Sequence, residues 1–299
     1  MSIPSLGFIG PIGFIGLGVM GSAMCANMAR KHGGPVHVFD MVPAAIAALA
    51  EVGAIAADSV AAVGQAADIV FLSLPGGSQV AAVCDELAEH LKPGAAVVDL
   101  STTSVAEARE IAGKLSAGGI AFADAPVART REAASAGTLS IMVGASEELF
   151  ARIAPLLAQM GSDVTHCGAV GCGQVVKLVN NALLFEQVVA IAEMMVVAGR
   201  AGVTPEKLIE AVGLGSGNSF ALQNHAVKAM APRQFPEKSF PPEYALKDLG
   251  YAIDLARDMG VDPQVALLAE RYYRAAVEQG HGGRYFPVVI ELIDKGIAP

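Results

Sequence analysis

Short apolar runs alternate with alanine-rich amphipathic runs between residue 12 and about residue 165. Runs such as "VHVFD", "DIVFLSLP" and "AAVVDLS" are separated by longer ones such as "QVAAVCDELAEHL". Short strands separated by helices form βαβ units, in which the strands are parallel and helices cover the sheet. The pattern predicts an α/β fold in which an N-terminal Rossmann-type, doubly wound sheet domain spans residues 12–170.

The first predicted strand, "IGFIG" at 12–16, leads directly into the glycine pattern G-x-G-x-x-G. In such a turn the first glycine allows the tight bend, the second lets a pyrophosphate approach the backbone, and the third lets the helix pack on the strand. We therefore expect the cofactor phosphates to lie against Gly16, Leu17, Gly18, Val19, Met20 and Gly21. An earlier "GFIG" at 7–10 runs into Pro11 and does not fit, so residues 1–11 are interpreted as an N-terminal extension.

Asp40 ends the second predicted strand, 19 residues beyond Gly21. An acid at this place accepts hydrogen bonds from the ribose hydroxyls of NAD and repels the 2′-phosphate of NADP. The alternative is a turn residue before Pro43. The spacing favours NAD as the cofactor.

The alternation of short apolar runs and amphipathic runs ends after "GAVGCG", near residues 168–173. The next segment, about 171–199, is apolar on nearly all sides, and a helix of that kind is normally buried. Further helical patterns cover 204–212, 219–231, 242–260, 263–279 and 286–294. We expect an all-helical C-terminal domain, 171–299, that begins with one long linking helix.

Lys177 lies inside this apolar helix, and Asn181 follows one turn later on the same face. A lysine among apolar residues needs a cleft, a partner or a ligand, and burial lowers the pKa of a lysine toward the range that suits proton transfer. The alternative is a lysine that extends to solvent at the start of the helix. The residues alone leave both interpretations open.

Charge and cysteine content indicate which partners and which cellular compartment to expect. The formal charge of −9 and the absence of a basic run argue against nucleic acid. The spacing of the four cysteines fits neither a zinc site nor a disulfide framework, so no metal is expected and the thiols are interpreted as reduced, in a cytoplasmic protein. No apolar run free of charge and glycine reaches about 18 residues, so we expect no membrane span.

Several motifs together resemble the β-hydroxyacid dehydrogenase family, which includes 3-hydroxyisobutyrate dehydrogenase and tartronate semialdehyde (2-hydroxy-3-oxopropionate) reductase. They occur in the family's order from residue 12 nearly to the end: "GFIGLGVMG", "FLSLP", "DLSTTS", "DAPV", "GTLSIMVG", "GCGQVVKLVNN" and "ALKDLGYA". The resemblance implies an NAD-dependent oxidoreductase that interconverts a small anionic β-hydroxyacid and its semialdehyde or keto form. It also implies an active site between the two domains and a homodimer or homotetramer.

The resemblance also implies roles for matching residues. Lys177 is the general acid and base, and Asn181 holds oxygen atoms of the substrate. The residues implied to contact the cofactor are Leu74, Pro75, Thr102, Phe240 and Lys247. Their alternatives are loop packing for Leu74 and Pro75, a helix cap for Thr102, a core aromatic for Phe240, and a surface lysine paired with Asp248 for Lys247.

One segment departs from the family pattern. After "DAPV" the family usually has Ser-Gly-Gly, which holds the substrate carboxylate, whereas this chain has Ala128, Arg129 and Thr130. Arginine suits bidentate recognition of an oxyanion, and the segment is similar to that of sulfolactaldehyde reductases. We expect Arg129 and Thr130 to bind the acidic end of the substrate, with a sulfonate ranked above the common carboxylates. The alternative is an arginine turned to solvent.

Other functions fit less well. An imine reductase commonly replaces the catalytic lysine, and a 6-phosphogluconate dehydrogenase is much longer. A rival of another class is a non-catalytic NAD-binding interaction protein, but relatives of that kind lack the lysine that is present here as Lys177.

Overall fold

A computed structural model describes residues 10–237 and 239–297. The chain divides into two compact units, between Lys177 and Leu178. Within the described residues the first unit contains nine strands and the second is helical, so the fold has the predicted class. Of the predicted N-terminal extension, residues 1–9 lie outside the described part of the chain.

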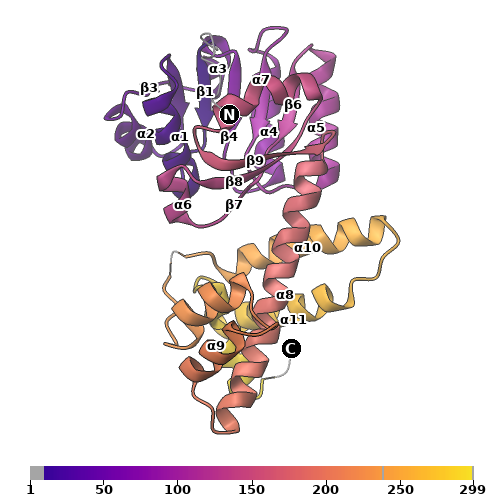
Figure 1. Ribbon diagram of the computed structural model, residues 1–299. Helices are drawn as coiled ribbons and strands as arrows, with labels where there is room; N and C mark the ends of the chain where they lie inside the picture. The colour runs from indigo at the N-terminus through magenta and orange to yellow at the C-terminus, as the bar shows by residue number, and fades with distance from the viewer. Residues whose placement is uncertain (1–9, 238, 298–299) are drawn as a thin grey trace. The chain divides into compact units, whose positions relative to one another are not determined.

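The first unit alternates strands and helices (Figure 1). In chain order its elements are β1 (Ile12–Ile15), α1 (Val19–Lys31), β2 (Val36–Phe39), α2 (Pro43–Ala50), β3 (Ile55–Ala56), α3 (Val60–Ala66), β4 (Ile69–Leu72), α4 (Gly77–Ala88), β5 (Ala96–Asp99), α5 (Val105–Ala117), β6 (Ala121–Asp124), β7 (Val127–Ala128), α6 (Arg131–Ala136), β8 (Leu139–Gly144), α7 (Glu147–Leu157) and β9 (Gly161–Gly168). Helix α8 (Cys172–Arg200) follows and continues into the second unit.

The strand order is β3-β2-β1-β4-β5-β6-β8-β7, and β9 pairs with β8. Strands β1 to β6 are parallel, with β1 between β2 and β4, whereas β8 runs antiparallel to β6. The order reverses direction at β1 and β4, so the loops after these strands open a crevice at the carboxyl edge of the sheet. Ligands of doubly wound sheets bind in that crevice.

The central strands β1 and β4 carry no polar side chain because both faces of the sheet are buried there. In β4, Ile69 and Phe71 belong to the core on one face, and Val70 and Leu72 to the core on the other. The same alternation divides β1, and Phe14 stacks on Phe71 of the neighbouring strand with ring centroids 6.2 Å apart. The period of two residues fixes the register of the central strands.

The second unit is a bundle around the C-terminal part of α8 (Figure 1). Its other elements are α9 (Pro205–Gly213), the π-helix η1 (Ala221–Met230), α10 (Pro242–Asp258), α11 (Gln264–Ala276), the π-helical turn η2 (Val277–His281), the 3₁₀ turn η3 (Phe286–Val288) and α12 (Val289–Asp294). The predicted helices 219–231 and 263–279 are thus partly π-helical, a difference that apolar periodicity cannot reveal because η1 still buries one face.

The expectation that α8 is buried on all sides is wrong. Phe185, Val188 and Ala192 lie in the core, but Leu183 and Met194 are 51% and 56% exposed. By length and hydropathy alone α8 could cross a membrane, a test that core helices of soluble proteins also pass. One face of this helix therefore lies in the core and the other is exposed, although both faces are apolar in sequence.

Candidate active site

The three glycines of the turn after β1 meet three different surroundings. Gly16 has φ +92°, and a Cβ there would lie 2.3 Å from the carbonyl oxygen of Ser73. A Cβ on Gly21 would lie 2.0 Å from the carbonyl oxygen of Gly16, whereas one on Gly18 would meet no atom within 4 Å. The first glycine therefore allows the bend, the third allows close helix packing, and the open side of the second leaves room for a pyrophosphate.

Helix α1 begins at Val19, with Gly18 as its N-cap. No side chain in the described part of the chain caps this end, so backbone amides of the first turn face the open side of Gly18. These amides and the helix dipole suit the phosphates of a dinucleotide. Leu17 is buried and three of the six residues of the turn are glycines, so the turn offers mainly its backbone to a ligand.

Asp40 follows β2 and is tied to the glycine turn. Its Oδ2 accepts a hydrogen bond from the amide of Leu17 at 2.6 Å, and its Oδ1 accepts one from the amide of Val42 at 2.8 Å. Each carboxylate oxygen has a second acceptor position. The carboxylate is thus fixed beside the turn and can still accept from ribose hydroxyls, so the residues present fit NAD.

The loops after β4 and β5 are joined to each other. The amide of Leu74 donates to Oγ of Ser101 at 2.9 Å, and the amide of Ser101 donates to Oδ1 of the buried Asp99 at 2.9 Å. These bonds place Leu74, Pro75 and Thr102 at the same edge of the sheet as the glycine turn. Thr102 is not the cap of α5, as the alternative for this residue supposed. Ser104 caps that helix and forms a capping box.

The start of α8 docks on the sheet through Asp124 at the end of β6. The amides of Gly171 and Gln174 donate to the two carboxylate oxygens of Asp124 at 2.6 and 2.7 Å. Burial raises the pKa of Asp124, and these backbone donors oppose that effect. Lys177 lies on the next turn, partly buried.

In the second unit, Asn181 and Lys247 share the carboxylate of Asp248, which is 2% exposed. Nδ2 of Asn181 donates to Oδ2 of Asp248 at 2.7 Å, and Nζ of Lys247 lies 3.2 Å from Oδ1 as an ion pair without hydrogen-bond alignment. Lys247 is therefore paired with Asp248, as the alternative for this residue supposed. Its side chain is only 28% exposed, however, so it is not an ordinary surface lysine.

Arg129 has partners at the edge of the sheet. Its Nη1 donates to the carbonyl oxygen of Thr138 at 2.6 Å and to Oγ of Ser162 at 2.9 Å, and its Nη2 pairs with Asp163 at 2.8 Å. Hydrogen bonds from Ser162 and Arg129 lower the pKa of Asp163. The guanidinium is thus engaged by the protein, and its binding to a substrate stays a prediction.

The neighbours of Arg129 have local roles. Ala128 belongs to β7 and pairs with Ser140, and the hydroxyl of Thr130 caps α6 by accepting from the amide of Ala133 at 3.4 Å. A capping hydroxyl can still donate its proton to a ligand. Contact of Thr130 or Ala128 with a substrate stays a prediction.

Phe240 lies in an aromatic cluster of the second unit. Its ring stacks on Phe185 with centroids 5.9 Å apart and meets Tyr244 and Phe286 edge to face. This placement matches the alternative of a core aromatic. Contact with the nicotinamide remains a prediction.

The thiols and other ligating side chains add no second chemistry. Burial raises the pKa of Cys25 to about 12, and burial also raises the pKa of Cys84 and Cys167. Among the residues described, no group of three or more His, Cys, Asp or Glu side chains could hold a metal ion. The role of Lys177 in proton transfer stays a prediction.

Two family models match nearly the whole chain. Residues 11–168 match the NAD binding domain of 6-phosphogluconate dehydrogenase, and residues 171–293 match the NAD-binding domain of NADP-dependent 3-hydroxyisobutyrate dehydrogenase. The chain belongs to the β-hydroxyacid dehydrogenase family.

Curated members of this family match over most of their length. 2-(Hydroxymethyl)glutarate dehydrogenase of Eubacterium barkeri is 35% identical over 95% of each chain. NAD-dependent L-serine dehydrogenase of Pseudomonas aeruginosa is 35% identical over 95% of this chain and 97% of its own. Human mitochondrial 3-hydroxyisobutyrate dehydrogenase is 32% identical over 95% and 86%.

A solved structure of Mycobacterium tuberculosis 3-hydroxyisobutyrate dehydrogenase with L-serine superposes with a TM-score of 0.88, at 32% identity over 95% of this chain and 99% of that one. A 3-hydroxyisobutyrate dehydrogenase from Salmonella typhimurium gives 0.84, at 30% identity over 94% and 99%. The similarity thus extends across both units.

Sequence reasoning missed three polar residues of this family member, Ser101, Asp124 and Gln174, and it named Asp248 only as a partner of Lys247, without its bond to Asn181. All are buried, which is unusual for their types. A polar residue directly after a predicted strand, as Ser101 and Asp124 are, was the available signal for two of them. Nothing local in the sequence distinguishes Gln174.

Proposed function

We propose that this chain oxidises, reversibly and with NAD, the hydroxymethyl group of a small carboxylate of the form CH₂OH–CHR–COO⁻. The chain is an NAD-dependent oxidoreductase of small hydroxyacids. 3-Hydroxyisobutyrate, L-serine and 2-(hydroxymethyl)glutarate, which appear in the names of the relatives, all have this form. The observation that carries the proposal is Lys177 on the helix whose start docks on Asp124, at the carboxyl edge of the sheet.

Lys177 supplies the proton chemistry in this proposal. In the oxidation, its neutral amine takes the hydroxyl proton as the carbonyl forms, and in the reduction its ammonium returns that proton to the oxygen. NAD⁺, when bound, accepts the hydride that leaves the carbon. Asn181 orients oxygen atoms of the substrate, and its amide is in turn oriented by Asp248.

The contacts of Arg129 favour a carboxylate over a sulfonate substrate. A guanidinium that already meets Asp163, Ser162 and the carbonyl of Thr138 has fewer donors left for a third anion oxygen. Sulfolactaldehyde reductase and tartronate semialdehyde reductase remain the alternative activities. We rank 3-hydroxyisobutyrate-like carboxylates first.

The direct test is turnover by the purified protein. NAD⁺ reduction is measured with 3-hydroxyisobutyrate, L-serine and 2-(hydroxymethyl)glutarate, and NADH oxidation with tartronate semialdehyde and sulfolactaldehyde. Lys177→Ala should lower kcat on the best substrate by roughly 100-fold or more and leave NADH binding nearly unchanged. Tight NADH binding with no turnover of any substrate would contradict the proposal and favour the non-catalytic interaction protein.

The four cysteines, all described, are free thiols, which supports a reducing compartment and hence a cytoplasmic location. We also propose that the protein is a homodimer or homotetramer. An exposed apolar stripe on α8, formed by Val179, Leu183, Ala190, Met194 and Val197, supports this assembly. Its residues recur at helical spacing, so one partner surface can cover them together.

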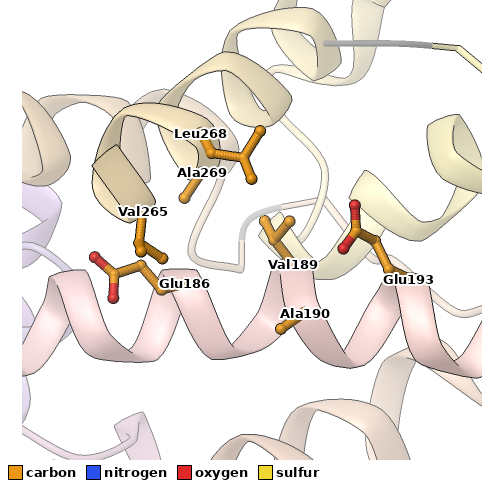
Figure 2. A pocket seen from close by; sticks show the side chains of 7 residues that line it. All are labelled: Glu186, Val189, Ala190, Glu193, Val265, Leu268 and Ala269. Carbon is orange, nitrogen blue, oxygen red and sulfur yellow. The ribbon is translucent and has the colours of Figure 1, made fainter. Parts of the chain in front are cut away.

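A shallow hollow of about 60 Å³ lies beside this stripe, between α8 and α11. Figure 2 shows its apolar lining, which includes Val189, Ala190 and Leu268, with Glu186 and Glu193 at its edge. Glu193 accepts a hydrogen bond from the hydroxyl of Tyr272 at 2.9 Å, and burial raises the pKa of Glu186. We interpret the hollow as part of the surface that a second copy covers rather than as a separate site.

A further inference from the structure

Gln174, the third residue of α8, is fully buried and bonds to the backbone on both sides of Thr102. The amide of Thr103 donates to Oε1 of Gln174 at 3.2 Å, and Nε2 of Gln174 donates to the carbonyl oxygen of Ser101 at 2.9 Å. One side-chain amide therefore satisfies a donor and an acceptor of the turn after β5. Buried backbone groups left without such partners are costly, so the turn depends on this residue.

The helix that carries Gln174 is itself fixed to the sheet. Asp124 caps its first turn, and a Cβ on Gly173 would lie 2.4 Å from the carbonyl oxygen of Met142. The helix thus approaches the sheet as closely as a glycine permits. A side chain anchored on this base has little freedom to move relative to β5 and β6.

Ser101 extends the connection to the loop after β4, because its Oγ accepts from the amide of Leu74. The two loops predicted to contact the cofactor are therefore joined through Ser101, and Gln174 joins both to α8. Lys177 lies three residues beyond Gln174, on the same side of the helix. All of these groups belong to the first unit.

We propose that Gln174 is a positioning residue, which holds the turn containing Thr102 at a fixed place relative to the turn of α8 that carries Lys177. This inference rests on the proposed role of Lys177. It predicts that Gln174 affects the hydride-transfer step more than the affinity for NAD. Misplacement of reacting groups by about 1 Å can lower a rate roughly 100-fold.

Gln174→Met tests this role, since it keeps the size of the side chain and removes both hydrogen bonds. Its kcat should fall roughly 10- to 100-fold, with a much smaller change in the KM for NAD. Asn27→Leu is the matched control. Asn27 is also a buried amide of the first unit, and its Nδ2 donates to the carbonyl oxygens of Ala23 and Ala134. The control should lower the Tm similarly and leave kcat nearly unchanged.

Gln174→Glu gives a reversible version of the same test. A protonated carboxyl can donate to Ser101 as the amide does, whereas a carboxylate cannot. Burial and the neighbouring carboxylate of Asp124 should raise the pKa of this new group. The ratio of variant to wild-type kcat should therefore rise as the pH falls, and a ratio that is constant with pH would overturn the proposal.

A readout without turnover separates this proposal from the proposed function. Hydrogen exchange of residues 100–105 is measured with and without NADH. NADH should protect this segment in the wild-type protein and in Asn27→Leu, and clearly less in Gln174→Met. Equal protection in all three proteins would overturn the role of Gln174 even if no hydroxyacid were turned over. An inactive wild-type protein that still shows the expected difference would refute only the proposed function.

Discussion

Arg129 occupies a backbone conformation that side chains rarely adopt. Its φ is +90°, in a region that favours glycine. The β-hydroxyacid dehydrogenases usually have glycine at the matching place, and this backbone angle gives the reason. In this chain the contacts of the guanidinium with Thr138, Ser162 and Asp163 offset the cost of the strained backbone.

Two substitutions of Arg129 separate backbone strain from side-chain contacts. Both Arg129→Gly and Arg129→Ala remove the guanidinium, but only glycine relieves the positive φ. The glycine variant should be more stable than the alanine variant by about 1 kcal/mol, measured by urea denaturation. Equal stabilities would contradict the strain.

The same glycine variant tests the substrate contact. If the guanidinium binds Ser162 and Asp163 of β9 and does not bind the substrate, Arg129→Gly should change the KM for the best carboxylate by less than about threefold. A rise of roughly 10- to 100-fold would instead assign the guanidinium to the acidic end of the substrate.

Asp40 should decide between NAD and NADP. Asp40→Ala removes both the ribose acceptor and the repulsion of a 2′-phosphate, so the ratio of kcat/KM for NAD to that for NADP should fall at least about tenfold. The ratio is the correct measurement because the lost bonds to Leu17 and Val42 harm both cofactors. A wild-type protein that uses NADP better would refute the assignment.

At the scale of elements, the π-helix η1 carries an unusual histidine. His225 is 8% exposed, and its Nδ1 lies 2.6 Å from the hydroxyl of Tyr285. Its Nε2 is buried without a hydrogen-bond partner in the described part of the chain. Burial, with a smaller effect of Lys228, lowers the pKa of His225 from 6.5 to about 4.

This histidine should make stability depend on pH. Between pH 6.5 and about 4 the unfolded chain binds this proton and the folded chain does not, so stability falls as the pH falls. The loss approaches about 3 kcal/mol near pH 4. His225→Gln should remove that part of the pH dependence, measured as the difference in unfolding free energy from wild type between pH 7 and 4. A difference that does not vary with pH would contradict the shifted pKa.

At the scale of the whole molecule, the stripe on α8 should control assembly. Leu183→Glu combined with Met194→Glu places two charges in a surface that a second copy covers, so the mass from light scattering should fall to that of a smaller species. Met259→Glu is the control, because Met259 is 67% exposed and follows α10, so it is not part of the stripe on α8. A monomeric wild-type protein would refute the proposed assembly.

The sequence by itself determined the elements and the cofactor turn. Unbroken apolar runs such as those of β1 and β4 are required for strands buried on both faces. Within the turn itself, Gly16 has a positive φ and a Cβ on Gly21 would clash with the carbonyl oxygen of Gly16, so both glycines have reasons that are local to the turn. The spacing of apolar residues along the sequence indicates whether a segment is a helix or a strand, because side-chain directions repeat every 3.6 residues in a helix and every two in a strand. The parallel strands β1 to β6 and the glycine turn could therefore be predicted closely, whereas the antiparallel pairing of β8 with β6 and β7 departs from the predicted parallel sheet.

Only the tertiary structure decided which polar groups meet. Gln174 reaches Ser101, 73 residues away, and Asn181 reaches Asp248, 67 residues away. Arg129 meets Asp163 because β7 and β9 flank β8. Such pairs depend on strand order and loop geometry, which no local period records, and the same is true of the exposed face of α8. The apolar pattern of the sequence predicts a helix around Lys177, but only the bonds from Gly171 and Gln174 to Asp124 show where that helix meets the sheet.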